Sequence, residues 1–360
     1  MTVDAAAPAA FELLAERVWE AVVRGDEAAA TAVVRRALED GVDAEGVLLD
    51  VIAPIQGRVG AQWAADRIGV AQEHAATAIS ERAVAVVAQY PAARTGPVRG
   101  RVAVACVDGE WHGLPARLLA EVLRLRGWQV DYLGAQVPTS HLVAHIHRTG
   151  PDVVALSSSI ATRLPAAHAT ITACQGAGTP VLVGGAAFGR DGRYARLLGA
   201  DAWAPDGRGA ARALAAGPLP RPQPDHQAID DLPHLADQEY TLVTRSRPHL
   251  VRTVFTGLES SFAAVRDYSE VQRERTAEDL SHMVEFLAAA LYTDDEDLFG
   301  EFLHWTAGVL AARGVPARTL PPALELLGRE LRDFPRAAAI LRSGAARLTR
   351  IPLTSAGTSV

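Results

Sequence analysis

The hydrophobic positions of residues 8–92 recur every three to four residues, a spacing that predicts amphipathic helices. Phe11, Leu14, Val18 and Val22 share one face of the first helix, and the Gly25-Asp26 pair ends it and caps the next. Three more helices of the same kind follow, with expected ends near Leu38, Trp63 and Gln89. Four helices joined by short connections predict an antiparallel bundle.

The pattern changes at Arg101, where short apolar runs begin to alternate with helical stretches. The helices are expected around 116–126, 139–148, 163–176 and 189–198, and the strands at Val102–Val107, Trp128–Leu133, Val153–Ser157, Val181–Gly184 and Asp201–Ala204. Five such units within residues 100–206 predict a doubly wound, Rossmann-type parallel sheet. The nucleotide-binding Gly-x-Gly-x-x-Gly pattern does not follow the first strand, so NAD is not the expected ligand.

A Gly-, Pro- and Asp-rich stretch at residues 207–236 predicts a linker between domains. Residues 237–350 then show only helical patterns, which predict an all-α third domain. Breaks between its helices are expected at Gly257, near Arg275-Thr276, at Asp294-Asp295, at Gly314-Pro316 and at Pro335.

Composition narrows the classes of function. A net charge of −7 argues against a general nucleic-acid binder. No apolar run reaches the ~18 residues that a membrane span requires, and the N-terminus lacks the basic start of a signal peptide. The two cysteines form no disulfide framework, so a cytoplasmic protein is expected. The chain contains no lysine, which excludes Schiff-base chemistry and a P-loop.

The stretch RVAVACVDGEWHGLP, residues 101–115, carries the most specific chemistry. It predicts a buried strand, a loop with Glu110, Trp111 and His112, and the start of a helix. Such a loop lies at the carboxyl edge of a parallel sheet, where α/β proteins bind ligands. An imidazole with a carboxylate two residues before it suggests a metal ligand and the group that orients it. A solvated loop histidine beside a surface charge is the simpler alternative.

Residues 8–206 resemble the cobalamin-binding module, a helical cap over a flavodoxin-like domain. The family's Asp-x-His-x-x-Gly signature stands here as Glu110-Trp111-His112-Gly113-Leu114-Pro115, with Glu for Asp and Pro for the last Gly. Ser157 and the glycines Gly184 and Gly185 occupy further family positions, suited to the nucleotide tail of cobalamin. The run Ser157-Ser158-Ser159 departs from the family's usual Ser-x-Leu, and Ser159 is also expected at the cofactor. The resemblance implies that His112 binds cobalt from below after displacing that tail.

The last helices of the expected bundle add a second resemblance. Trp63, Val70, Glu73 and His74 have the spacing seen in CarH-type cobalamin photoreceptors, where these side chains cover the upper face of adenosylcobalamin. The residue after the tryptophan is Ala64, whereas that family has a histidine that takes the upper cobalt position after photolysis. The same residues also fit simpler roles, the tryptophan in a core and the pair Glu73-His74 on a solvated helix turn.

Residues 237–350 resemble the globin-like, bilin-binding domain of the photocobilins, which combine cobalamin with biliverdin. The domain contains no cysteine, so biliverdin would bind non-covalently. An apolar slot and polar partners for the pigment are expected among Phe286, Leu287, Phe299, Phe302, Trp305, His249, His282, His304, Arg252, Arg266 and Arg313. A plain six-helix bundle with an arginine-rich surface explains the same residues, and spacing alone does not select the pigment contacts.

These resemblances imply a light sensor rather than an enzyme. Light would break the cobalt–carbon bond of adenosylcobalamin, and a change of domain arrangement would be the signal. The helix-turn-helix domain of such regulators has no counterpart before the module, so direct DNA binding is not expected, and the output is expected to be a homo-oligomer or a separate effector protein. A corrinoid protein that carries methyl groups between methyltransferases is the main alternative, and a cobalamin-dependent antirepressor is another.

Overall fold

A computed structural model of the chain describes residues 6–90, 99–222, 232–315 and 319–349. Its contacts divide the chain into two units, residues 1–228 and 229–360. The ends of the expected bundle (91–92) and of the expected third domain (350), and part of the expected linker (223–231), lie outside the described residues.

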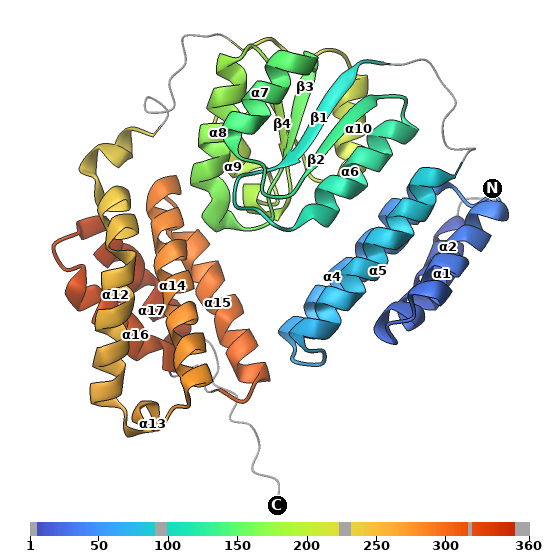
Figure 1. The fold of residues 1–360 in the computed structure, drawn as a ribbon. Coiled ribbons are helices and arrows are strands. Elements are labelled where there is room, and N and C mark those ends of the chain that lie inside the picture. Colours follow the sequence, from blue (N-terminus) through green and yellow to red (C-terminus); the bar gives the residue numbers. More distant parts are fainter. Residues whose placement is uncertain (1–5, 91–98, 223–231, 316–318, 350–360) are drawn as a thin grey trace, which may run out of the picture. The chain divides into compact units, whose positions relative to one another are not determined.

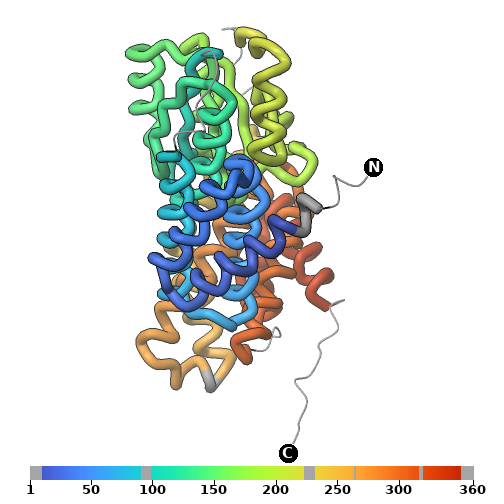
Figure 2. The backbone as a smooth tube through the Cα atoms, turned by 90° about the vertical axis from the view of Figure 1, so that its right-hand side faces the viewer, coloured from blue at the N-terminus to red at the C-terminus, as the bar shows by residue number. Residues whose placement is uncertain are grey.

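Four helical segments open the first unit, at the positions that the hydrophobic period predicts. Asp26 begins the second segment by accepting a hydrogen bond from the backbone N–H of Ala29 at 2.9 Å. The segments pack α1 on α2, α2 on α5 and α4 on α5, and Figure 2 shows them side by side in blue to cyan. Their elements are α1 (Ala6–Val23), α2 (Glu27–Glu39), α3 (Ala44–Gly46), η1 (Val47–Ile52), α4 (Ala53–Ala64) and α5 (Val70–Gln89).

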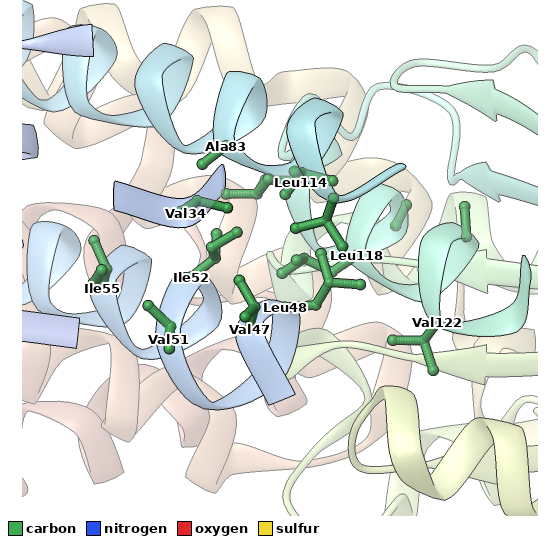
Figure 3. Packing of buried hydrophobic residues seen from close by; sticks show 14 of the residues in the cluster. Val34, Val47, Leu48, Val51, Ile52, Ile55, Ala83, Leu114, Leu118 and Val122 are labelled. Atoms are coloured by element: carbon green, nitrogen blue, oxygen red, sulfur yellow. The ribbon is translucent and has the colours of Figure 1, made fainter. Parts of the chain in front are cut away.

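The third segment differs from a plain α-helix because its central part, η1, is a π-helix. Four of the five apolar residues of η1 are buried, and Leu49 is partly buried. Figure 3 shows Leu48 of this segment next to Leu118 of the sheet domain. Full burial of one such side chain stabilises the fold by about 1.5–3 kcal/mol. The packed face therefore joins the helices to the sheet domain within one hydrophobic core.

The sheet has five parallel strands in the order β2-β1-β3-β4-β5. This is the order of flavodoxin-like folds, so the expected doubly wound, flavodoxin-like sheet is confirmed. In the register, Cys106 pairs with Ser157 and Ser157 with Gly184, so the loops after these strands leave the sheet at one edge. The strands are β1 (Arg101–Cys106), β2 (Gln129–Gly134), β3 (Val153–Ser157), β4 (Val181–Gly184) and β5 (Ala202–Ala204).

Helices cover both faces of the sheet, with α6 and α10 on one face and α7, α8 and α9 on the other (Figure 1). They are α6 (Gly113–Leu125), α7 (Thr139–Thr149), α8 (Leu164–Gly176), α9 (Arg193–Leu197) and α10 (Gly207–Ala215). Two sequence predictions need correction here. The helix expected at 189–198 is only five residues long, after a turn at Gly189 and Gly192 with positive φ. The expected linker begins with helix α10, because Asp206 caps it and Ala210, Ala211 and Leu214 are buried.

Two arginine–carboxylate contacts also join the helical segments to the sheet domain. Arg126 donates two hydrogen bonds to Glu45, at 2.7 and 2.9 Å. Arg208 donates two to Asp50, at 2.8 and 2.5 Å, and also lies 3.5 Å from Glu45. Paired contacts of this kind fix orientation as well as distance.

The described part of the second unit contains helices and no strand. Its helices are α12 (Glu239–Ser261), α13 (Ala263–Arg266), α14 (Glu270–Thr293), α15 (Glu296–Ala312), α16 (Leu320–Glu330) and α17 (Pro335–Thr349), preceded by the 3-10 turn η5 (Pro233–Asp237). The breaks predicted at Gly257 and near Arg275-Thr276 are wrong, since both positions lie inside helices. None of the described helices of the chain combines the length and hydropathy needed to cross a bilayer.

Candidate functional site

His112 lies where the first strand gives way to the first helix of the sheet domain. Gly109, with a φ of +75°, makes the turn after β1, and His112 is the residue before α6. The strand order reverses at this point, with β2 on one side of β1 and β3 on the other. Ligands of doubly wound sheets bind in the crevice at such a reversal.

Glu110 is fully buried beneath this loop, and its carboxylate accepts hydrogen bonds from two loops. Oε1 accepts from the backbone N–H of His112 at 3.0 Å, and Oε2 accepts from the backbone N–H groups of Ser159 and Ile160 at 2.7 and 3.1 Å. The hydroxyl of Ser158 lies 3.2 Å from Oε2. Burial alone raises the pKa of Glu110, but hydrogen bonds from His112 and Ser159 and the charge of His112 outweigh it and lower the pKa to about 2.

The ring of His112 is oriented by the same carboxylate. Nδ1 lies 2.6 Å from Oε1 of Glu110, and because that carboxylate is ionised, Nδ1 carries the proton and donates it. In the neutral form of the ring Nε2 then keeps its lone pair, and the side chain is 40% exposed. This is the arrangement by which proteins hold an imidazole ready for a metal ion.

Trp111 connects His112 with a residue of the helical segments. Its indole is 53% exposed and lies against the His112 ring, with ring centroids 4.7 Å apart. It also makes an edge contact with the ring of His74, at 6.4 Å between centroids. The structure therefore brings His74, Trp111 and His112 together from separate parts of the sequence.

His74 is oriented much as His112 is. Its Nδ1 lies 2.5 Å from Oε2 of Glu73, and Oε1 of Glu73 accepts a hydrogen bond from the Thr77 hydroxyl at 2.9 Å. Gln56 of α4 donates in turn to the Thr77 hydroxyl at 2.6 Å. This chain of polar groups directs Nδ1 of His74 toward Glu73, and the side chain remains 58% exposed.

The other two residues expected with His74 lie at the adjacent ends of α4 and α5. Trp63 is partly buried in the last turn of α4, next to Ala64, which ends that helix. Val70 is the first residue of α5 and is 56% exposed. No contact described for the chain joins Val70 to Trp111 or His112.

The serine and glycine positions fall at the same edge of the sheet, with different roles. Ser157 is buried within β3, whereas the carboxylate contacts come from Ser158 and Ser159. Gly185 has a φ of +102°, and a Cβ there would lie 2.2 Å from the Ser158 carbonyl oxygen. Its lack of a side chain is thus needed to bring the β4 loop against the β3 loop. A Cβ at Gly113 would make an ordinary contact of 3.5 Å with the Tyr132 hydroxyl, whereas one at Gly184 would lie closer, 3.1 Å from the Ala204 carbonyl oxygen.

The residues of the second unit that were expected to contact the pigment lie partly on its surface and partly in its core. His249, His282 and His304 are exposed, on α12, α14 and α15. Asp279 has a raised pKa because burial outweighs the positive charges of His282 and Arg313, so these three groups lie near one another. No hydrogen bond or ion pair of the described residues joins His249 or His304 to this group.

The aromatic residues of the second unit mostly form its core. Leu287, Phe299 and Phe302 are buried, and Trp305 is exposed. The rings of Phe286 and Phe302 stack at 4.0 Å between centroids. Stacked rings at the edge of a core supply an apolar wall, in a plain helical bundle as well as in a pigment site.

Sequence reasoning missed one residue at the sheet edge. Arg163, at the end of the 3-10 turn η3 (Ala161–Arg163), places its guanidinium over Gly109. The signal was a single basic residue directly before the helix that follows β3, and a solvated arginine has the same signature.

Comparison with known proteins separates the first unit into its helical segments and its sheet domain, as the structure does. Two family models, both described as "B12 binding domain", match residues 14–88 and 100–215. The HTH-type transcriptional repressor CarA of Myxococcus xanthus is 33% identical over 184 residues, which cover 48% of this chain and 58% of CarA. The HTH-type transcriptional repressor CarH of the same organism is 35% identical over 143 residues, 38% of this chain and 46% of CarH.

The chain thus spans about half the length of these curated relatives. Among solved structures, the monomethylamine corrinoid protein of Methanosarcina barkeri matches with a TM-score of 0.49 and 20% identity, over 57% of this chain and 98% of that one. The B12 binding domain matched at residues 100–215 contains Glu110 and His112, and the one matched at residues 14–88 contains Glu73 and His74. The chain is therefore a cobalamin-binding protein, whose first unit carries B12 binding domains related to those of CarA and CarH.

Proposed function

We propose that this protein is a cobalamin-dependent photoreceptor, and not an enzyme, in which adenosylcobalamin binds between His112 and the residues around His74. The observation that carries the proposal is the line of contacts His74–Trp111–His112, which joins the expected lower ligand to the expected upper face. The oriented imidazole of His112, at a sheet edge where ligands bind, fits a corrinoid.

In this proposal His112 supplies Nε2 to cobalt from below, and Glu110 keeps the proton on Nδ1. Replacement of His112 by Ala is expected to weaken cobalamin binding and to remove the spectrum of the histidine-bound form. Val42→Ala, a change remote from the loop, is the control. Unchanged affinity and spectrum in His112→Ala would contradict the assignment of the lower ligand.

Bound adenosylcobalamin would supply a cobalt–carbon bond that visible light breaks. Trp63, Val70, Glu73 and His74 would cover the adenosyl group, and the two exposed side chains among them offer it contact. Loss of ~100 Å² of such contact corresponds to ~2–3 kcal/mol, sufficient to shift a two-state arrangement more than tenfold. The wild-type protein is expected to prefer adenosylcobalamin to methylcobalamin, and Trp63→Ala to reduce that preference.

The test is an absorption spectrum of the protein with each corrinoid, in the dark and after illumination, together with its mass in solution. We expect a light-induced change of oligomeric state, or of affinity for a separate effector protein, only with adenosylcobalamin. With Ala64 in place of a histidine, no second imidazole is expected on cobalt from that position.

The second unit is proposed to bind biliverdin non-covalently and to tune the light response. The stacked Phe286 and Phe302 offer an apolar wall, and His282 and Arg313 offer positive charge for propionates. Titration of the full chain with biliverdin is expected to shift and sharpen the pigment spectrum, and the pigment should extract fully from denatured protein. A spectrum that stays that of free biliverdin at micromolar protein would leave this unit as a docking or dimerisation bundle.

A corrinoid methyl carrier is the second candidate, favoured by the exposure of Val70 and His74, because a methyltransferase needs access to the upper face. A carrier is expected to bind methylcobalamin at least as well as adenosylcobalamin and to show the same mass in the dark and after illumination. That pair of results would replace the photoreceptor proposal.

A further inference from the structure

Arg163 lies at the edge of the sheet where the strand order reverses. Strand β3 ends at Ser157, the loop 158–160 donates to Glu110, and η3 then carries Arg163 to the start of α8. The loops that follow β1 and β3 thus bring Gly109 and Glu110 together with Arg163.

The guanidinium of Arg163 rests on the face of Gly109. A Cβ built at Gly109 would lie 3.2 Å from Nη1, 3.4 Å from Cζ and 3.7 Å from Nε of Arg163. Any larger side chain at position 109 would push the guanidinium away. Gly109 therefore allows the guanidinium of Arg163 to lie where it does, in addition to forming the turn.

The guanidinium of Arg163 contains a buried donor that has no acceptor in the described part of the chain. Its Nε–H group is buried and donates to no acceptor among the described residues. No carboxylate in the described part of the chain forms an ion pair with it, and both oxygens of nearby Glu110 are engaged by His112 and the 158–160 loop. A buried donor without an acceptor costs free energy, and in native proteins it is usually satisfied by a ligand, an ion or water.

We propose that Arg163 binds the phosphodiester of the nucleotide tail of cobalamin. The inference rests on the proposed binding of cobalamin with His112 as lower ligand, which would displace the tail from cobalt and leave it to bind at the same edge of the sheet. The phosphodiester is the anionic group of that tail, and a guanidinium is the side chain best suited to its oxygens. The N-terminal end of α8, a helix of 13 residues, begins at the next residue and adds partial positive charge.

Arg163 would then select complete corrinoids over those without a nucleotide tail. The test compares adenosylcobalamin with adenosylcobinamide, which lacks the tail and its phosphate, by titration of the full chain. Replacement of Arg163 by Gln is expected to weaken cobalamin binding about tenfold, the size of a charge-assisted hydrogen bond that is partly open to water. Cobinamide binding should change less than twofold, and Arg163→Lys should recover part of the loss.

The matched control is Arg212→Gln, which removes an exposed arginine from α10 and should alter neither affinity. Equal affinity of wild type and Arg163→Gln for cobalamin would overturn the inference and leave the proposed function intact. An equal loss for both corrinoids would also overturn it, since that result assigns Arg163 to the support of the Gly109 turn. Absence of binding of either corrinoid by wild type would overturn the proposed function and this inference together.

Discussion

Replacement of Glu110 by Gln tests how much the buried carboxylate contributes to the fold. The amide keeps the size of the side chain, but it loses the charge and turns one acceptor into a donor. At least one of the N–H groups of His112, Ser159 and Ile160 then faces another donor. We expect the free energy of unfolding of the first unit to fall by about 2–4 kcal/mol at pH 7, the range for breaking a buried charged network.

The pKa of Glu110 gives an independent value for the same quantity. Folding lowers it from 4.5 to about 2. At 1.36 kcal/mol for each pKa unit, this corresponds to about 3 kcal/mol. Between these two values the unfolded chain binds a proton that the folded chain does not, so this stability is complete above pH 4.5 and is lost as the pH falls toward 2.

The assay is denaturant unfolding followed by tryptophan fluorescence, because five of the six tryptophans lie in the first unit. The difference between wild type and Glu110→Gln should be constant from pH 7 to 5 and should shrink in more acidic solution. Glu81→Gln, an exposed change on α5, is the control and should cost less than about 0.5 kcal/mol. A difference that is small at pH 7, or that does not vary with pH, would refute the reasoning.

Three further predictions concern the same unit. Gly185→Ala should destabilise it by about 3 kcal/mol or more because of the close carbonyl, whereas Gly178→Ala, with positive φ and open space, should cost about 1 kcal/mol; thermal unfolding separates the two. Glu45→Gln should lower the free energy of unfolding, measured by urea denaturation, by about 1–2 kcal/mol, because it breaks the paired contact with Arg126 that joins the helices to the sheet domain. Burial raises the pKa of Cys106 and of Cys174 to about 12, so neither thiol should react with a disulfide reagent at pH 8 until the chain unfolds.

The sequence predicted most of the sheet domain because its strands are continuous apolar runs bounded by turn residues. Glu110 and His112 could be placed together for the same reason, since the end of a strand determines where its loop lies. The hydrogen bond from Nδ1 of His112 to Glu110 agrees with the orienting role expected for that carboxylate. Whether His112 binds cobalt remains a prediction.

The features that the sequence did not reveal depend on tertiary contacts rather than on the spacing of hydrophobic residues. Gly257 was expected to end a helix, but a Cβ there would lie 2.8 Å from Leu326, so the glycine allows two helices to approach closely. The serine run showed a polar loop but not which serine contacts Glu110. Arg163 was missed because its importance depends on Gly109, more than fifty residues earlier in the chain.

The two oriented histidines differ in how firmly the protein holds them. Glu110 is buried and tied to the loop after β3, so His112 cannot turn without disturbing two strands. Glu73 is 27% exposed and sits in the first turn of α5, where a modest movement of one helix end would reorient His74. Under the proposed function this asymmetry separates two tasks. A rigid lower ligand secures affinity through preorganisation, and a less constrained upper residue allows the loss of the adenosyl group to change the position of α5.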